Sequence, residues 1–337
     1  MTEIVNTIDE TYKIYNADEY MKLDIPERRF VMYPFIAEES ATMVIAARGT
    51  GKTFLGLSMA LAIASGESFL KFKIEKACSV LYVDGEMHPK DLQNRLIQIE
   101  NGFLKHGKKV IRENLRIFPC GKQNGKLMPD LATEKGQIML EQYIKESEII
   151  FFDNVACLYG RGGIRENESE TWGPMNNWSI KQRNQNKSVV WIHHTGKDES
   201  RGGRGSSAMD GIIDAQIKLT RPYGYEASDG ADILIEYTKT RSLAGEDLAT
   251  TRARLVSNAQ QEPDIKKQYV WWEMGKSPKD ELREQVTDMY LKENKTIVQI
   301  AKELSVSKTT VGRLVSGLKK KTVKEELPPM LANLMPQ

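Results

Sequence analysis

The segment that most constrains the fold is 46–53, which reads Ala-Ala-Arg-Gly-Thr-Gly-Lys-Thr. It fits the phosphate-binding loop pattern G-x-x-x-x-G-K-[ST] at every position except the first. A short β-rich run, 42–45, precedes the loop, and a helical apolar stretch, 54–65, follows it and stops at Gly66. A strand, loop and helix in this order direct backbone N–H groups and the positive end of a helix dipole at a phosphate chain. The segment therefore predicts an α/β fold with a phosphate-binding site.

The loop also predicts separate roles for its residues. Lys52 is expected to reach the β- and γ-phosphates, and Thr53 to hold Mg²⁺. Ala46 stands where the first glycine is expected, and its methyl group restricts φ, so a slightly altered turn is expected. The alternative is a glycine-rich turn that happens to precede Lys-Thr. The predicted nucleotide-binding residues are Ala47, Arg48, Gly49, Thr50, Gly51, Lys52 and Thr53.

Length and composition set broad limits. The 337 residues suggest two domains. The net charge of +2 does not by itself indicate a binding partner, so only local clusters of charge can indicate one. Cys78, Cys120 and Cys157 lack metal-ligand spacing and are expected to be reduced thiols of a cytoplasmic protein. The sequence has no secretion signal, and no apolar run approaches the roughly 18 residues of a membrane span, so no membrane contact is expected.

Between 42 and about 240, β-type runs alternate with helical patterns. The β-type runs are 42–45, 79–83, 115–118, 149–152, 189–193, 215–219 and 233–237, and the helical stretches are 53–65, 89–104, 133–146 and 169–185. This alternation predicts a mostly parallel sheet with helices on both faces, closed by strands within 247–275. The predicted divisions are an N-terminal arm at 1–29, an α/β domain at 30–275, a helical domain at 280–325 and a tail at 326–337.

Acidic residues follow two of the predicted strands. Glu86 lies just past the run 79–83, where a carboxylate can orient and deprotonate an attacking water. Asp84 is a weaker candidate, and the alternative for both is a helix N-cap. Asp153 ends the very apolar run 149–152, where a carboxylate is costly unless it is paired or near a metal. Mg²⁺ is its expected partner, and the alternative is a surface turn with Asn154.

A histidine pair ends a third strand. A polar side chain at this position can hydrogen-bond the γ-phosphate, and adjacent strand residues face opposite ways. His194 is the first candidate and His193 the second. The alternative is a zinc half-site, but no cysteine or acidic ligand lies nearby at suitable spacing.

Three cations further along the chain are candidates for contact with a phosphate. Arg204 lies in the basic, glycine-rich segment 201–207, and Lys239 and Arg241 project to the same side of a strand. They are expected to reach the nucleotide of a neighbouring subunit, or for Arg204 a nucleic-acid phosphate. The alternative is an ordinary exposed basic loop.

Taken in order, these motifs resemble the RecA-like ATPases, and more closely the branch that contains plasmid RepA-type hexameric replicative helicases. The matching segments are 47–53 (Walker A), Glu86 (catalytic glutamate), 149–153 (Walker B), 193–194 with 204–208 (sensor and arginine finger) and 239–241 (Lys-x-Arg pair). The resemblance covers about residues 30–250. It implies ATP and Mg²⁺ as cofactors, a ring usually of six subunits, ATP at subunit interfaces and single-stranded DNA in the channel. The loops 159–165 and 196–205 are then expected to face that channel.

The C-terminal part predicts a separate helical unit. Apolar positions give helical faces to 296–304 and 308–319, joined by a short turn, with a supporting helix around 282–290. This arrangement is typical of a helix-turn-helix. Residues 294–324 hold eight Lys or Arg and one acidic residue, which favours contact with duplex DNA. The predicted DNA-binding residues are Lys308, Thr309, Thr310, Arg313 and Lys319; the alternative is a helical bundle for protein contacts.

The sequence therefore predicts an ATP-hydrolysing, DNA-acting ring motor, most simply a replicative helicase of a plasmid, phage or other mobile element. A second hypothesis is an ATP-dependent switch that binds duplex DNA as a replication initiator or regulator without unwinding it. A third is a recombinase-like protein that forms filaments.

Overall fold

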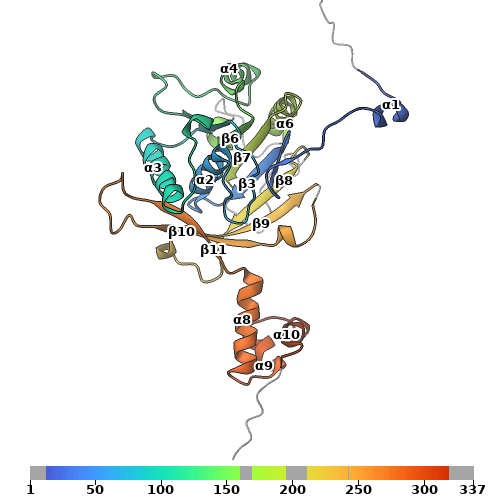
Figure 1. Cartoon of the computed structure of the whole chain (residues 1–337), viewed down its shortest axis with the longest axis vertical. Coiled ribbons are helices and arrows are strands. Elements are labelled where there is room, and N and C mark those ends of the chain that lie inside the picture. Colours follow the sequence, from blue (N-terminus) through green and yellow to red (C-terminus); the bar gives the residue numbers. More distant parts are fainter. Residues whose placement is uncertain (1–12, 160–168, 195–210, 242, 319–337) are drawn as a thin grey trace, which may run out of the picture.

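A central sheet organises the molecule. The computed structural model describes residues 13–159, 169–194, 211–241 and 243–318. Those residues form one nine-stranded sheet of order β11-β10-β9-β8-β3-β7-β6-β4-β5 (Figure 1). The strands are β3 (Ala41–Ala46), β4 (Val80–Asp84), β5 (Leu115–Pro119), β6 (Ile149–Asp153), β7 (Ser188–His194), β8 (Ala215–Thr220), β9 (Asp232–Thr240), β10 (Thr251–Ser257) and β11 (Val270–Gly275).

The sheet is parallel from β8 to β5 and antiparallel from β8 to β11. The predicted RecA-like arrangement, a mostly parallel sheet with helices on both faces, is confirmed. Parallel strands present all their carboxyl ends at one edge. The residues that follow β3, β4, β6 and β7 therefore meet along that edge, where the phosphate loop lies.

Two apolar cores cover the two faces of the sheet. One contains α2 (Lys52–Ser65) and part of α3 (Pro89–Lys105), which pack on Tyr82, Phe151 and Ile192. The other contains α4 (Glu134–Ile144), α5 (Val155–Leu158) and α6 (Ser169–Arg183), which pack on the opposite sides of the same strands, at Phe152 and Trp191. Alternate residues of one strand thus serve opposite cores, as expected for central strands buried on both faces.

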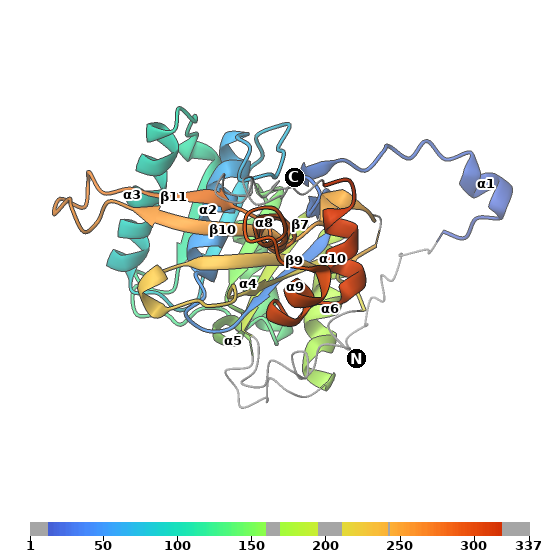
Figure 2. The ribbon, with the colours of Figure 1, turned by 90° about the horizontal axis from the view of Figure 1, so that it is seen from below.

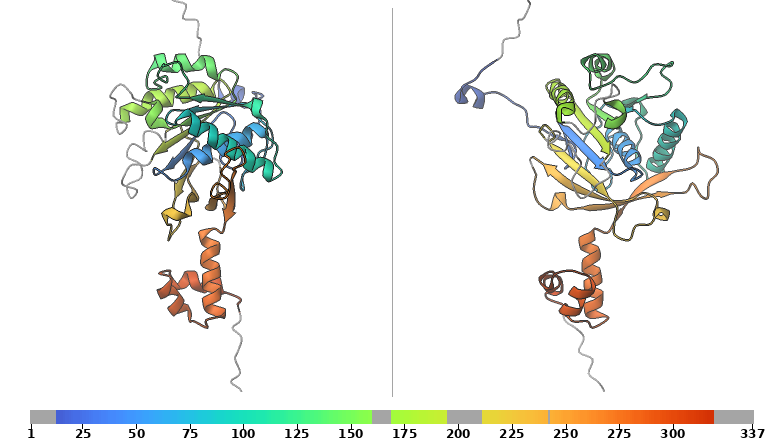
Figure 3. Two further views of the ribbon diagram at one scale, coloured as in Figure 1. Left: turned by 90° about the vertical axis from the view of Figure 1, so that its left-hand side faces the viewer. Right: turned by 180° about the vertical axis from the view of Figure 1, so that it is seen from behind.

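The ends of the described chain lie outside these layers. At the N-terminal side, residues 13–29 carry the short helix α1 (Ala17–Met21), which lies away from the sheet (Figure 3). A small hairpin follows, formed by β1 (Phe30–Met32) and β2 (Ile36–Ala37). Single 3₁₀ turns occur at Arg112–Asn114, Ala227–Asp229 and Glu246–Leu248.

Three C-terminal helices form a unit with its own apolar core. They are α8 (Pro278–Leu291), α9 (Ile297–Glu303) and α10 (Lys308–Val315), and Val286, Ile300 and Val311 meet between them. Seen from below, α8 is viewed end-on with α9 and α10 beside it (Figure 2). The helix predicted over 308–319 ends at Val315 instead, because Gly317 takes a left-handed φ of 85°. The assignment of this unit as a helix-turn-helix stays a prediction.

One ion-pair network joins the three-helix unit to the sheet. The Arg252 guanidinium on β10 donates to both carboxylate oxygens of Asp232, over 3.0 and 2.9 Å, and also to Glu281 on α8. Two carboxylates beside this guanidinium raise its pKa. In the described part of the chain, no helix combines the length and the apolar character that a bilayer crossing requires.

Candidate functional site

The phosphate loop joins β3 to α2 at the carboxyl edge of the sheet. Gly49 and Gly51 have φ values of 73° and 100°, a left-handed conformation that glycine adopts without strain. Ala46 belongs instead to the last pair of β3, opposite His194 and Leu219, and is fully buried. The loop turns only after this residue. Its methyl group therefore occupies an ordinary strand position, and the altered turn expected from the sequence is not seen at Ala46.

Lys52 begins α2 with its side chain folded back on the loop. Its ammonium group donates to the carbonyl oxygens of Ala46 and Ala47, over 3.1 and 2.6 Å, and the residue is only 5% exposed. Burial lowers the Lys52 pKa to about 8, while Asp153 and Glu86 act in the opposite direction. A buried ammonium whose hydrogen bonds to described residues go to neutral carbonyls suits a site in which an anion arrives with the ligand.

Two buried carboxylates stand side by side next to the loop. Asp84 and Asp153 end neighbouring strands and are paired in register. Asp153 accepts a hydrogen bond from the Tyr82 hydroxyl over 2.7 Å, and the nearby Thr53 hydroxyl acts to lower its pKa. Burial raises the pKa of Asp153, and it raises that of Asp84 to about 6. Asp84 Oδ2 accepts from the Met87 amide over 3.0 Å, whereas Oδ1 has no partner among the described residues.

These groups fit a magnesium nucleotide. A hydroxyl and a single carboxylate, Thr53 and Asp153, are the kind of protein ligands that Mg²⁺ takes together with phosphate oxygens and water. The described residues contain no group of three or more His, Cys, Asp or Glu arranged to hold a metal on their own.

Glu86 reaches the same pocket from just beyond β4. Its side chain is 59% exposed, and one carboxylate oxygen accepts from the Asn154 amide over 2.5 Å. The His194 Nε2 atom lies 3.9 Å from that oxygen. Burial and the nearby Lys52 lower the His194 pKa, so its ring is neutral at neutral pH. Glu86 is therefore held in place by Asn154 and remains accessible to a water molecule.

The two histidines face opposite ways, as strand alternation predicts. His194 lines the pocket with Lys52 and Glu86. His193 packs with its ring edge-on to Trp172, at a centroid distance of 5.4 Å, and burial lowers its pKa to about 4. The placement thus favours His194 over His193 as the group that can contact a phosphate.

The pocket and the contacts that support it include residues that no sequence motif marks. Arg95 of α3 stacks over the Phe54 ring at 4.6 Å, and both line the pocket. Arg221, just after β8, donates to the Gly49 carbonyl over 2.6 Å and lies over the Tyr225 ring. Asn154 could have been suspected, since it follows Asp153 directly. No motif marks Arg95 or Arg221.

Other predicted site residues lie elsewhere or outside the described chain. Lys239 and Arg241 lie at the amino edge of the parallel strands, because Lys239 pairs with Gln216 at the start of β8. They do not join the pocket of their own chain. On α10, Lys308, Thr309 and Arg313 are exposed, and Thr310 is half-buried beside Ser307. Arg204, Lys319 and the loop 196–205 lie outside the described residues, as does 159–165 except Tyr159.

The loop, the lysine and the strand-end acids define the site of a P-loop nucleotide hydrolase. The family of AAA domains named AAA_25 matches residues 10–200. The chain belongs to this family and is a P-loop ATPase. No curated protein matches it.

Two solved structures are similar at low identity. The flagellar accessory protein FlaH from Methanocaldococcus jannaschii has a TM-score of 0.46 and 14% identity, over 71% of this chain and 91% of its own. The KaiC-like protein PH0186 from Pyrococcus horikoshii has a TM-score of 0.42 and 14% identity, over 70% of this chain and 91% of its own.

Proposed function

We propose that the protein is an ATP-driven motor that forms a ring on DNA, a replicative helicase of a plasmid, phage or other mobile element. The observation that carries the proposal is the position of Glu86, just past the end of the strand next to the Asp153 strand and in the same pocket as Lys52. A glutamate on that strand, rather than beside Asp153, is the feature shared with RepA-type helicases.

Each group in the pocket has a role in ATP hydrolysis. Lys52 and the loop amides bind the phosphates, and Thr53 and Asp153 would hold Mg²⁺, which would neutralise charge on the phosphate oxygens. Glu86, oriented by Asn154, positions the attacking water and accepts its proton. His194 is neutral and close to Glu86, so its ring can hydrogen-bond the terminal phosphate and respond to its loss.

The ring is proposed from the groups at the opposite edge of the sheet. Lys239 and Arg241 lie away from the phosphate-loop pocket of their own chain, so we assign them to the nucleotide bound at the phosphate loop of a neighbouring subunit. Arg204 is proposed for the same interface. A hexamer follows from the resemblance to RepA-type helicases. DNA contact is proposed for α10, whose Lys308, Thr309 and Arg313 side chains are exposed.

The direct test of the ATPase site is Lys52→Ala. Loss of the ammonium removes the phosphate contact, so ATP turnover should fall to background in a steady-state phosphate-release assay. The control is Lys76→Ala, an exposed lysine outside the pocket, which should keep parental turnover. Both variants should match the parent in circular dichroism. Full turnover by Lys52→Ala would overturn the assignment.

A switch that binds duplex DNA without moving along it is the second candidate. The observation in its favour is the separate core of α8, α9 and α10, typical of a module that binds independently of the ATPase domain. A strand-displacement assay on a forked duplex separates the two functions. A motor releases the strand only with ATP, whereas a switch binds the duplex and leaves it paired.

A further inference from the structure

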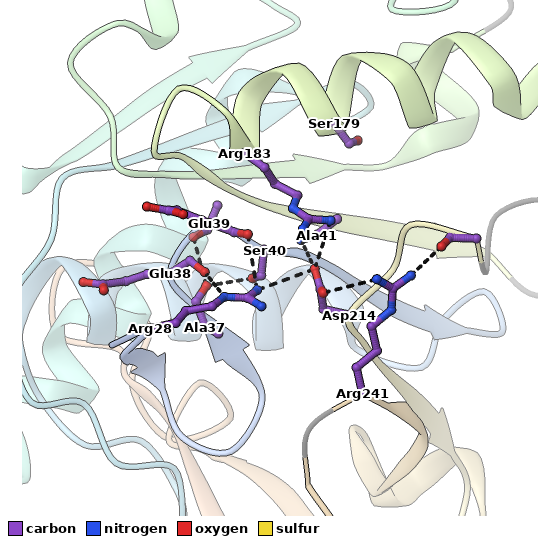
Figure 4. Close-up of polar contacts among 12 residues, drawn as sticks. Arg28, Ala37, Glu38, Glu39, Ser40, Ala41, Ser179, Arg183, Asp214 and Arg241 are labelled. Carbon is purple, nitrogen blue, oxygen red and sulfur yellow. Dashed lines mark hydrogen bonds and ion pairs between the residues drawn. The ribbon is translucent and has the colours of Figure 1, made fainter. Parts of the chain in front are cut away.

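Three arginines gather around one aspartate at the edge of the sheet opposite the phosphate loop (Figure 4). Arg28 precedes β1, Arg183 ends α6, and Arg241 follows β9. Their guanidinium groups lie 3.6, 3.8 and 3.8 Å, in that order, from the Asp214 carboxylate. The three come from distant parts of the sequence, so only the fold brings them together.

Asp214 does not hydrogen-bond these arginines. Its Oδ2 atom accepts from the Ala41 backbone amide over 3.0 Å, whereas all three ion-pair distances exceed hydrogen-bond length. A single arginine would neutralise this carboxylate. The cluster therefore carries positive charge in excess, and counting the nearby Glu39 carboxylate still leaves one positive charge unmatched.

Two of the arginines are fixed in place by the backbone. Arg28 donates to the carbonyls of Glu38 and Glu39, over 2.5 and 3.2 Å, and Arg241 donates to the carbonyl of Gly211. The single charge of Asp214 offsets only part of the repulsion among three guanidinium groups. The excess positive charge therefore favours binding of a further anion.

The Arg183 guanidinium has N–H donors that are available to a ligand. No described residue accepts a hydrogen bond from its guanidinium, which is 29% exposed and pairs only with Asp214 among the described residues. It lines an open polar pocket together with Arg28, Glu39, Asn184 and Asn186. The Arg183 guanidinium, the remaining N–H groups of Arg28 and two side-chain amides around one opening match the several oxygens of a phosphate group, while the Glu39 carboxylate there opposes its binding.

We propose that Arg28 and Arg183 form a second phosphate-binding site, separate from the phosphate loop, with Arg241 adding positive charge on the other side of Asp214. The ligand is a phosphate group, supplied either by a nucleotide or by the backbone of a nucleic acid. Asp214 orders the arginines when the site is empty and lowers its affinity, because the carboxylate repels the incoming anion. The inference does not depend on the proposed helicase function.

The test measures binding of tripolyphosphate to the full chain carrying Lys52→Ala, which removes the phosphate-loop contact. Arg183→Gln in this background should weaken binding about tenfold, as expected for loss of a charge-assisted hydrogen bond. The matched control is Lys181→Gln, on the same helix, where Lys181 pairs with Glu141 instead. It removes the same charge and should leave binding unchanged.

Two further variants separate binding from structure. Asp214→Asn keeps an oxygen for the Ala41 amide and removes the negative charge, so it should tighten binding. Arg183→Lys should restore part of the loss caused by Arg183→Gln. Thermal unfolding of the Arg183 and Lys181 variants should match that of the parent, whereas Asp214→Asn should unfold at a lower temperature because it removes the carboxylate paired with three arginines.

The outcomes decide the proposal and identify the source of the phosphate. If a nucleic-acid backbone is the ligand, an oligothymidylate without a terminal phosphate, titrated in the same way, should also bind more weakly to the Arg183→Gln variant. If a nucleotide is the ligand, the Arg183 dependence should be seen with tripolyphosphate and not with the oligothymidylate. The proposal is overturned if neither compound binds, if Lys181→Gln weakens binding as much as Arg183→Gln, or if Asp214→Asn also weakens it.

Discussion

Lys52 should make nucleotide affinity depend on pH in the alkaline range. Burial lowers its pKa to about 8, so the side chain is charged below that pH and neutral above it. Only the ammonium form attracts phosphate, and affinity should therefore be full below about pH 8 and fall as the pH rises further. Titration of a non-hydrolysable ATP analogue between pH 7 and pH 10 measures this.

The matched variant for this titration is Lys52→Arg. Arginine stays charged throughout the range, so its affinity, although lower, should not change between pH 7 and pH 10. The same decline in both proteins would assign the pH dependence to another group.

Asn154 is expected to act through Glu86. Its amide donates to the Glu86 carboxylate, while its carbonyl oxygen accepts from the Cys157 amide and caps α5. Asn154→Ser keeps an acceptor for the cap but cannot reach Glu86. Turnover should fall roughly 10- to 100-fold with little change in KM, by analogy with residues that orient catalytic groups. Steady-state kinetics test this, and a rise in KM alone would place Asn154 in binding instead.

At the residue scale, strand ends were predictable and supporting contacts were not. Lys52, Glu86, Asp153 and His194 follow apolar runs, and parallel strands bring their ends together whatever the details of packing. Arg221 reaches Gly49 from a segment far along the chain. No local pattern reports such a contact, because it depends on how two distant loops pack.

Among the elements, β3 explains why the loop accepts Ala46. Because Ala46 is a buried strand residue with an ordinary φ, Ala46→Gly adds freedom to the unfolded chain without relieving strain. The free energy of unfolding should fall by about 0.5–1 kcal/mol, and turnover should stay within about twofold. Chemical denaturation and a turnover assay check both. A large gain in turnover would mean that the methyl group strains the loop.

Elements with strong periodicity were predicted well, and their ends less so. Seven predicted β-type runs became strands, because apolar residues at central positions are buried whatever follows. The helix predicted over 308–319 was too long, because an apolar periodicity continues through Leu318 while the backbone turns at Gly317. The antiparallel direction of β9 could not be predicted, since hydrophobicity carries no strand direction.

For the whole molecule, the separate core of the C-terminal helices predicts that DNA binding and basal ATP turnover can be uncoupled. If α10 binds duplex DNA as proposed, Arg313→Glu should weaken that binding at least tenfold, because the substitution replaces a phosphate or base contact by repulsion. ATP turnover measured without DNA should be unchanged. The control is Lys279→Glu on α8, and fluorescence anisotropy with labelled duplex gives the affinities. Equal losses in both variants would indicate a general charge effect instead.

The hydrogen bond from Ala41 to Asp214 fixes one end of β3, and the phosphate loop continues from the other end. The proposed second phosphate-binding site therefore lies at the start of β3, and the nucleotide pocket lies at its end. If occupancy of one end displaces this strand, thermodynamic reciprocity requires each ligand to change the affinity of the other by the same factor. Movement of β3 would then link phosphate binding at the second site to nucleotide binding at the phosphate loop.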